Sequence, residues 1–329
     1  MRKLLLGTTA LAAAASLTAN AALADVSLSG MIEWSYNSRS SNVASNDGTT
    51  FDQVSEMQVN FSNKTDSGLT LGMQVDMNTM DGSIGHDETS LSISGGFGKI
   101  VLGENDAAAE SYIIDESDLI AEDAAPTVMS MSVSQSSSLK LEDSDNNKIS
   151  YHLPAMGGLT VGISHTDGGA AATSTDTNTY GAKYAMEAAG AAITLAYTNA
   201  TTEVSGAQDK DSDSMGVKIV SGDVSMIISQ SSNEAANEDV TGQGASISYK
   251  MPNGMTVGAY TFKSEDDLDP GEEYSRSGFE VQYTIASGLT AYINVDDYDY
   301  KEGTSNDASS ALSVDDSGTN SKLTIKATF

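Results

Sequence analysis

Apolar and polar residues alternate with a period of two over much of the chain, and this alternation constrains the fold more than any other feature. Between positions 26 and 36 the even-numbered residues are apolar or glycine, whereas the odd-numbered residues include Ser27, Ser29 and Glu33. Alternate residues of a β-strand face opposite sides, so the pattern predicts a strand with one apolar and one polar face. The same alternation recurs in five further segments: 69–77, 191–197, 279–285, 289–295 and 323–329.

None of the six apolar faces carries a charged side chain, whereas the polar faces include Glu33, Asp76, Glu280 and Lys326. A Lys or Arg that faces lipid at mid-membrane costs about 2–4 kcal/mol, so a bilayer would enforce this exclusion of charge. A soluble β-sandwich also alternates, but it has less reason to keep one face so free of charge. The pattern therefore favours the strands of a membrane-spanning β-barrel.

Connections of two kinds separate the strands. Seven short turns contain glycine: 66–68, 95–96, 156–158, 189–190, 221–222, 252–254 and 287–288. Eight longer, mostly acidic segments lie between them: 38–52, 81–87, 105–146, 166–177, 201–211, 232–241, 263–275 and 298–319. Together they require sixteen strands, and short turns at one end with long loops at the other are typical of an outer-membrane barrel. We expect short periplasmic turns and long external loops.

Aromatic residues are spaced as a barrel in a membrane requires, because such barrels carry an aromatic girdle at each interface. Four tyrosines lie on the apolar parity shortly before short turns and predict a periplasmic ring: Tyr151, Tyr184, Tyr249 and Tyr283. Three aromatic residues near the long loops predict the outer ring: Trp34, Tyr36 and Tyr197.

The first 24 residues are interpreted as a secretory signal peptide, which leaves residues 25–329 as the barrel domain. Arg2 and Lys3 precede an apolar stretch over 4–15, and Ala22-Leu23-Ala24 supplies small residues for cleavage. The chain has 16 basic and 46 acidic residues, a net charge of −30, and no cysteine. These counts argue against nucleic-acid binding and exclude disulfides.

Several stretches resemble the general diffusion porins of the Gram-negative outer membrane, especially the sixteen-stranded trimeric type. They are the start of the first strand at 24–30, the Gly-rich stretch 95–103 before the longest loop, the stretch 147–151 after it, and terminal Phe329. The resemblance implies a homotrimer in outer-membrane lipid and lipopolysaccharide, with Phe329 as a signal to the barrel-assembly machinery. It also implies passive diffusion of ions and small hydrophilic solutes.

In the family the third external loop folds into the lumen, and the loop in the matching place spans 105–146. We expect acidic residues at its start to constrict the pore: Asp106, Glu110, Asp115, Glu116, Asp118, Glu122 and Asp123. Glu104 and Ser150 stand where the family commonly has arginines. The remaining candidates for the pore wall are Glu33, Gln58, Gln74, Asp76, Glu104, Lys148, Ser150, Glu280 and Lys326. Carboxylates in a narrow passage favour cations, so the sequence predicts a cation-preferring channel.

The sequence contains little that indicates a bound cofactor or a catalytic site. Calcium or magnesium could bind weakly at the acidic external segments 209–213 and 265–269, but neither has EF-hand spacing and solvated loops explain them better. The histidines, His86, His152 and His165, form no recognisable triad or zinc motif, so no enzymatic activity is expected.

Two other interpretations stay open. A substrate-specific nutrient porin would use the same barrel, with specificity set by the detailed fold of residues 105–146. A secreted acidic, β-rich adhesin would use the long loops as contact surfaces, but it would need neither a charge-free face nor a terminal aromatic residue.

Overall fold

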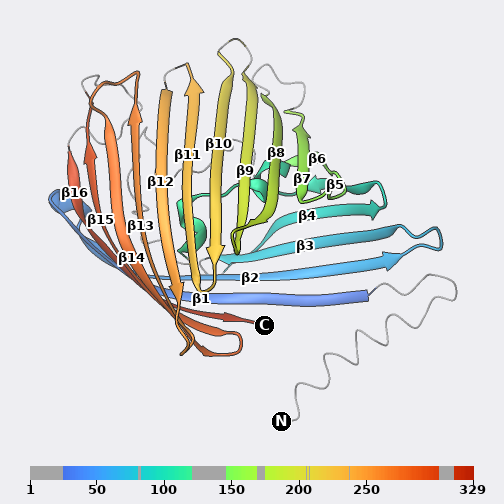
Figure 1. The fold of residues 1–329 in the computed structure, drawn as a ribbon, viewed down its shortest axis with the longest axis horizontal. Helices are drawn as coiled ribbons and strands as arrows, with labels where there is room; N and C mark the ends of the chain where they lie inside the picture. The colour runs from blue at the N-terminus through green and yellow to red at the C-terminus, as the bar shows by residue number, and fades with distance from the viewer. Residues whose placement is uncertain are drawn as a thin grey trace.

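The protein is a closed barrel of sixteen antiparallel strands (Figure 1). The computed structural model describes residues 25–80, 83–120, 146–168, 175–204, 206, 208–236, 238–303 and 315–329, so the expected signal peptide lies outside the described residues. The strands are β1 (Asp25–Ser41), β2 (Gly48–Lys64), β3 (Thr70–Met80), β4 (Ser83–Gly95), β5 (Gly98–Glu104), β6 (Asn147–His152), β7 (Leu159–Thr166), β8 (Thr175–Ala188), β9 (Ala191–Val204), β10 (Lys210–Ser221), β11 (Val224–Ala235), β12 (Glu238–Lys250), β13 (Met255–Asp266), β14 (Glu273–Ala286), β15 (Leu289–Lys301) and β16 (Asp316–Thr328).

Each strand pairs with its neighbours in sequence, and β1 pairs with β16 to close the barrel. Trp34 of β1 lies opposite Ile325 of β16, and Glu33 lies opposite Lys326, so apolar residues pair on one face and polar residues on the other. At the seam, the backbone N–H of terminal Phe329 donates to the carbonyl of Gly30 over 2.9 Å. The predicted sixteen-stranded architecture is confirmed.

The two faces of the wall differ as the alternation predicts. Leu28 is 60% exposed and Ile228 is 64% exposed on the outer face, where the large apolar side chains lie. The inner face of the same sheet carries polar residues such as Thr324, Asn320 and Ser229. Because lipid replaces water around the outer face, these exposed apolar side chains are the part of the surface that a membrane covers.

All seven predicted turns join consecutive strands. Between β8 and β9 the turn is Ala189-Gly190, and both residues have positive φ, 52° and 81°. Two consecutive residues in this region make the tight hairpin that matches the twist of antiparallel strands, and glycine adopts it without a steric cost.

Several long loops are shorter than predicted. The expected loop at 38–52 is mostly strand, since β1 continues to Ser41 and β2 begins at Gly48. The last loop, expected at 298–319, likewise loses residues to β15 and β16. Apart from Phe51, Tyr298 and Tyr300, these strand ends carry polar residues on both faces, so the alternation that marks a half-apolar strand is weak there. The third loop is an exception, because β5 ends at Glu104 and β6 begins at Asn147 as expected.

The aromatic residues predicted for the two rings lie on the outer parity of their strands. Tyr184, Tyr249 and Tyr283 are exposed beside short turns. At the other end of the strands, Trp34 and Tyr36 pack on Phe51 of β2, with ring centroids 5.4 and 5.1 Å apart. Within the described residues, the helices are the 3₁₀ turns η1 (Ala44–Asn46), η2 (Ala108–Tyr112) and η3 (Glu116–Leu119). No helix in this part of the chain is long and apolar enough to cross a membrane.

Candidate functional site: the strap inside the barrel

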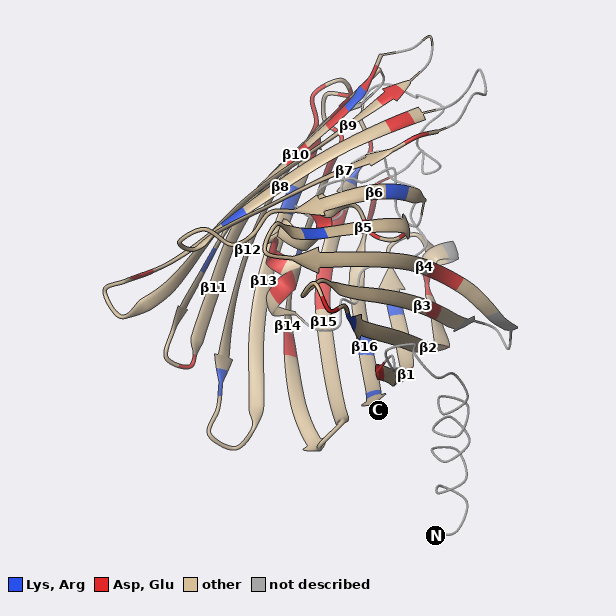
Figure 2. Cartoon of the chain, turned by 90° about the vertical axis from the view of Figure 1, so that its right-hand side faces the viewer, with Lys and Arg blue, Asp and Glu red and all other residues tan. Residues whose placement is uncertain are grey.

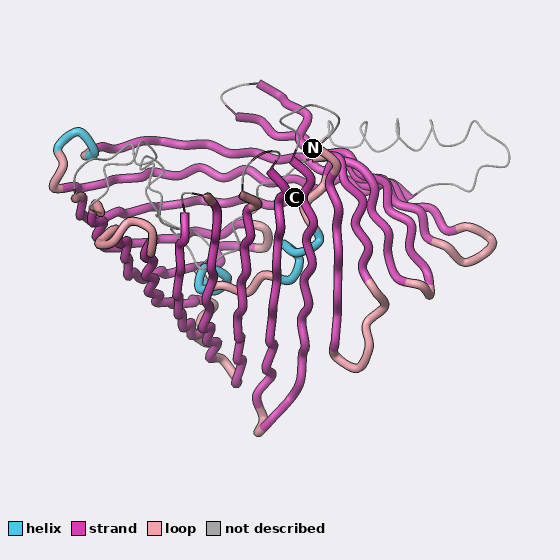
Figure 3. The backbone as a smooth tube through the Cα atoms, turned by 90° about the horizontal axis from the view of Figure 1, so that it is seen from above, coloured by secondary structure: helices cyan, strands magenta, loops and turns pink. Residues whose placement is uncertain are grey.

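After β5 the chain turns into the barrel. Residues 105–120, which we call the strap, run along the inner wall, as the two short helices inside the strand ring in Figure 3 show. Helix η2 packs against β7, β8 and β9, and η3 packs against β11, β12 and β13. The strap therefore crosses much of one side of the lumen. The rest of this loop, residues 121–145, lies outside the described residues.

Backbone hydrogen bonds fix the beginning of the strap to the wall. The N–H of Ala108 donates to Ser164 Oγ of β7 over 3.1 Å, and the N–H of Ala109 donates to Thr179 Oγ1 of β8 over 3.3 Å. The two hydroxyls lie 2.6 Å apart and bond to each other. The first N–H groups of a helix have no partner within the helix, so wall hydroxyls satisfy those of η2.

Tyr112 anchors the end of η2. Its hydroxyl forms a 3.1 Å hydrogen bond with His152 Nδ1 of β6, and the two rings stack at 6.0 Å. Tyr112 is buried, and Gly162 and Gly181 of the wall leave the space that its ring occupies.

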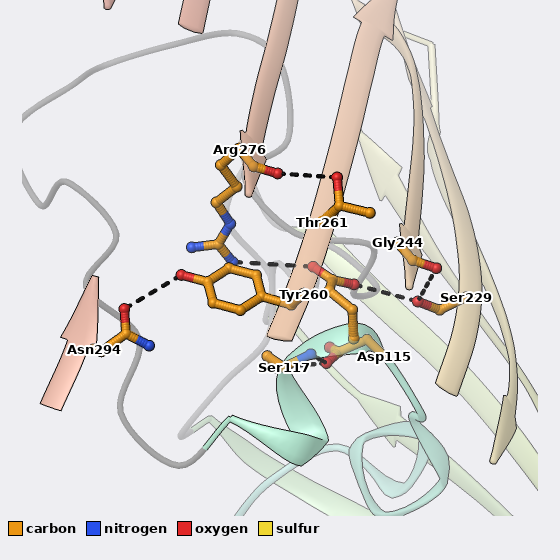
Figure 4. A network of polar contacts seen from close by, with 9 residues as sticks. Asp115, Ser117, Ser229, Gly244, Tyr260, Thr261, Arg276 and Asn294 are labelled. Carbon is orange, nitrogen blue, oxygen red and sulfur yellow. Dashed lines mark hydrogen bonds and ion pairs between the residues drawn. The ribbon is translucent and has the colours of Figure 1, made fainter. Parts of the chain in front are cut away.

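Glu116 fixes the next part of the strap through contacts with Ser229 and Arg276, which Figure 4 labels. Its side chain is fully buried, and Oε1 lies 4.0 Å from Nη2 of Arg276 on β14. The hydroxyl of Ser229 donates to Glu116 Oε2 over 3.2 Å. The Arg276 guanidinium also lies 5.3 Å above the ring of Tyr260, a cation–π contact. We call Glu116 and Arg276 the latch.

The structure divides the predicted constriction residues into two groups. Asp115 and Glu116 are buried: Asp115 accepts hydrogen bonds from the N–H and hydroxyl of Ser117, and Glu116 belongs to the latch, so neither carboxylate is presented to the lumen. Asp106 and Asp118 are exposed, and Glu110 is half-buried. Glu122 and Asp123 lie outside the described residues.

Asp118 is the strap carboxylate whose electrostatic setting is clearest. Its pKa is raised, first because the surrounding protein removes water from it and second because Asp115 is near. Lys218 of β10 and Lys183 of β8 act in the opposite direction. The strap thus presents an acid to two wall lysines.

Across from the strap, the inner faces of β16, β1, β2 and β3 form what we call the open wall. Glu33 lies between two lysines, 3.6 Å from Lys322 and 3.3 Å from Lys326. On β2 and β3, Asn60 donates to Gln58 over 2.7 Å and Gln74 donates to Asp76 over 2.7 Å. Predicted wall residues Glu33, Gln58, Gln74, Asp76 and Lys326 all lie on this face.

Other predicted wall residues are placed differently. Lys148, Ser150 and Glu280 lie on the inner face but are buried. The Lys148 ammonium bonds to the carbonyl of Asn105, at the start of the strap. Glu104 shares the parity of Leu102, which pairs with outward-facing Leu91, and its carboxylate lies 3.6 Å from His86 Nδ1. The expectation that Glu104 lines the pore is therefore wrong.

Sequence reasoning missed several inward-facing basic residues, among them Lys183, Lys218, Lys322, Arg39 and Arg276. Each lies on the inner parity of its strand, so the alternation could have located them. The prediction counted Lys148 and Lys326 as the scarce positive groups of the wall, and the structure shows that there are more.

At the acidic external segments, no group of three or more potential metal ligands gathers among the described residues. Figure 2 shows acidic residues near the loop ends of the strands. In the segment 209–213, Asp211 accepts from Thr201 over 2.6 Å, Asp213 accepts from Asn199 over 3.2 Å, and Asp209 accepts from the N–H of Val204 over 3.2 Å. Each of these three carboxylates thus accepts a hydrogen bond from a neighbouring group of the protein.

Comparison with known proteins agrees with this architecture. Residues 7–303 match the family described as Gram-negative porin. The fold is similar to that of an anion-selective porin from Comamonas acidovorans, with a TM-score of 0.69 and 16% identity over 93% of this chain and 100% of that chain. It is also similar to OmpT of Vibrio cholerae lacking loop L8, with a TM-score of 0.67 and 12% identity over 93% of this chain and 99% of that chain. No curated protein matches the chain.

Proposed function

The chain belongs to the Gram-negative porin family, whose barrels are outer-membrane channels for passive diffusion rather than enzymes, and we propose that its own channel prefers cations. The observation that carries this proposal is the charge of the strap. Residues 105–120 contain five carboxylates and no Lys or Arg. Carboxylates that border a passage with a low local dielectric attract cations and repel anions.

Two of these carboxylates supply the effect. Asp106 and Asp118 are exposed inside the barrel, whereas Asp115 and Glu116 are buried against protein groups. On the opposite side, Asp52 and Glu56 add exposed carboxylates on the inner parity of β2. A diffusing cation would meet acidic groups from both sides.

The basic residues of the inner wall limit this preference without reversing it. Lys322 and Lys326 share Glu33, and Arg276 is buried beside Glu116. Lys183 and Lys218 are within electrostatic range of Asp118. Because these bases have acidic neighbours, we propose a moderate cation preference rather than a strict one. The anion selectivity of the Comamonas acidovorans porin belongs to that protein, and at 16% identity the likeness concerns the fold.

A reversal potential tests the proposal. Purified protein is reconstituted in a planar lipid bilayer under a potassium chloride gradient, and the zero-current potential is compared for the wild type, Asp118→Asn and Asp106→Asn. We expect a cation-selective sign that weakens in both variants. Glu234→Gln is the control, because Glu234 is exposed on the outer parity of β11. An anion-selective wild type, or equal shifts in the control and the strap variants, would contradict the proposal.

We also propose that the mature protein begins at Asp25 and forms a homotrimer in contact with lipopolysaccharide. The aromatic cluster of Trp34, Tyr36 and Phe51 on the outer face of β1 and β2 supports an interface there, since such clusters are favourable when desolvated. Phe329, whose side chain is 83% exposed, is available to the assembly machinery. Chemical cross-linking in detergent should yield a trimer, and a uniformly monomeric product would contradict the trimer.

A further inference from the structure

The strap rests on a row of small residues that crosses the inner wall. Most of its members are opposite one another in register: Gly162 lies opposite Gly181, Ala196 opposite Gly216, Gly216 opposite Ser229, and Ser229 opposite Gly244. Between β8 and β9 the row shifts by two residues, because Gly181 lies opposite Thr198 and Ala196 lies two residues before Thr198 on the same face. The small-residue row, Gly162, Gly181, Ala196, Gly216, Ser229 and Gly244, therefore extends from β7 to β12.

Alternate strap residues occupy the space that this row leaves. Tyr112 lies over Gly162 and Gly181, Ile114 over Gly216, and Glu116 over Gly244. Ile114 also packs with Ala196 and with Ile227 of β11. An extended chain places every second side chain on the same side, so the strap directs one set of side chains into the wall.

None of the four glycines in this row has room for a methyl group, and three of them, Gly181, Gly216 and Gly244, show why. At Gly181, an added Cβ would lie 2.7 Å from Tyr112 Cβ and 2.9 Å from its ring. At Gly244 it would lie 2.6 Å from Glu116 Cδ, and at Gly216 it would meet the backbone carbonyl of Ile114. Carbon atoms do not approach so closely, so the strap or the wall would have to move.

Which atoms must move differs among the three positions. At Gly216 the obstacle includes strap backbone, at Gly181 it is the base of a side chain, and at Gly244 it is the far half of Glu116. A side-chain end can adjust by rotation about its χ angles, but backbone can yield only by displacement of the strap. Because the wall lies on one side of the strap, that displacement is toward the lumen.

We propose that Gly181, Gly216 and Gly244 set the width of the channel, because the absence of a side chain at these positions determines how closely the strap lies against the wall. They are positioning residues that act through Tyr112, Ile114 and Glu116. This inference rests on the diffusion channel described above, but not on its ion preference.

The barrel supplies a matched control on the same strand. Gly242 lies two residues from Gly244 on the same inner face of β12, and an added Cβ there would lie 2.9 Å from Ser231 Oγ and 3.1 Å from Phe262. These neighbours belong to the wall and not to the strap. Gly242→Ala therefore crowds neighbouring wall side chains, though less severely, without contact to the strap.

The experiment compares unit conductance and reversal potential of Gly216→Ala, Gly181→Ala, Gly244→Ala and Gly242→Ala in planar bilayers. We expect the unit conductance to fall most for Gly216→Ala, less for Gly181→Ala and Gly244→Ala, and least for Gly242→Ala, at an unchanged sign of the reversal potential. Conductances of the three strap-facing variants equal to that of Gly242→Ala would overturn the proposal. A reversal potential of anion-selective sign in the wild type would contradict only the ion preference.

A second measurement tests the position of the strap without the glycine variants, in case those variants fail to fold. The chain has no cysteine, and Ala109 of the strap packs on Ala200 of β9. A disulfide between Ala109→Cys and Ala200→Cys should form and leave the unit conductance of the folded channel unchanged, because the strap already lies against the wall. A large change in conductance on reduction would show that the open channel holds its strap elsewhere and would overturn the proposal.

Discussion

The two sides of the barrel lumen use different kinds of side chain. Under the strap, the inner faces of β7 to β12 carry mostly Gly, Ala, Ser and Thr, and most of these residues are buried, although Lys183 and Lys218 also lie on this side. The open wall carries longer, charged or amide side chains such as Glu33, Lys326 and Gln58, which stay partly exposed. The comparison indicates a division of tasks: small residues position the strap and so shape the passage, and the strap together with the long residues of the open wall supplies its charge.

The largest loss of stability is expected from breaking the latch, the buried contact between Glu116 of the strap and Arg276 of β14. Arg276→Met leaves the fully buried carboxylate of Glu116 without this cation, and breaking a buried pair by removing one partner costs about 3–5 kcal/mol. Thermal or denaturant unfolding should show this loss for Arg276→Met. The double variant Glu116→Gln, Arg276→Met should be less destabilised than the single variant. Equal or greater destabilisation of the double variant would argue against the latch.

Charge on the open wall should affect selectivity more than stability. Glu33→Gln leaves Lys322 and Lys326 without their shared carboxylate and should shift the reversal potential toward anions. Lys326→Met should shift it toward cations. Because these groups are partly exposed, we expect melting temperatures to change little. Shifts of the same sign in both variants would contradict an electrostatic role for this wall.

The strap should contribute a pH dependence that the open wall lacks. The pKa of Asp118 is raised because the surrounding protein removes part of its water and because Asp115 is near, so its carboxylate takes up a proton at a higher pH than an ordinary aspartate does. As the pH falls from 7, the cation preference should therefore begin to decrease at a higher pH than ordinary aspartates alone would cause. Asp118→Asn should remove that early decrease in a series of reversal potentials. An unaltered pH profile in the variant would exclude Asp118 as its source.

The smallest effect is expected from a chelator. The carboxylates of segment 209–213 each accept a hydrogen bond from a protein group, and no cluster of potential metal ligands occurs among the described residues. Addition of EDTA to detergent-solubilised protein should leave its melting temperature unchanged. A clear decrease in the melting temperature that magnesium or calcium reverses would instead support a metal site at the external loops.

Much of the fold could be predicted because a membrane imposes a simple rule on the strands. Where lipid covers one face, as along Val26–Tyr36, the alternation is strong and the strand was identified. Where β1 and β2 extend beyond the apolar band, both faces are polar except for Phe51, and the prediction placed a loop. The predicted number of strands was still correct, because it was counted from the turns and loops and not from where each strand ends.

The site was harder to predict because it depends on contacts between distant segments. The inward course of the strap came from a family resemblance, and the burial of Asp115 and Glu116 depends on Ser117, Ser229 and Arg276. Glu104 was wrongly assigned to the pore wall because the assignment followed the matching position in the family. Its parity in β5, which it shares with outward-facing Leu102, was not considered. Glycines on the inner parity of β7, β8, β10 and β12 were visible in the sequence, but the register that aligns them was not.

The most direct test of the division between the two walls is the reactivity of single cysteines toward a charged, water-soluble thiol reagent. Gln58→Cys lies on the open wall, and Ser164→Cys lies under the strap at a position that is 6% exposed in the wild type. The absence of native cysteine makes each label unique. In reconstituted channels the account predicts fast modification with a change in conductance at position 58 and slow modification at position 164. Equally fast modification at both positions would contradict it.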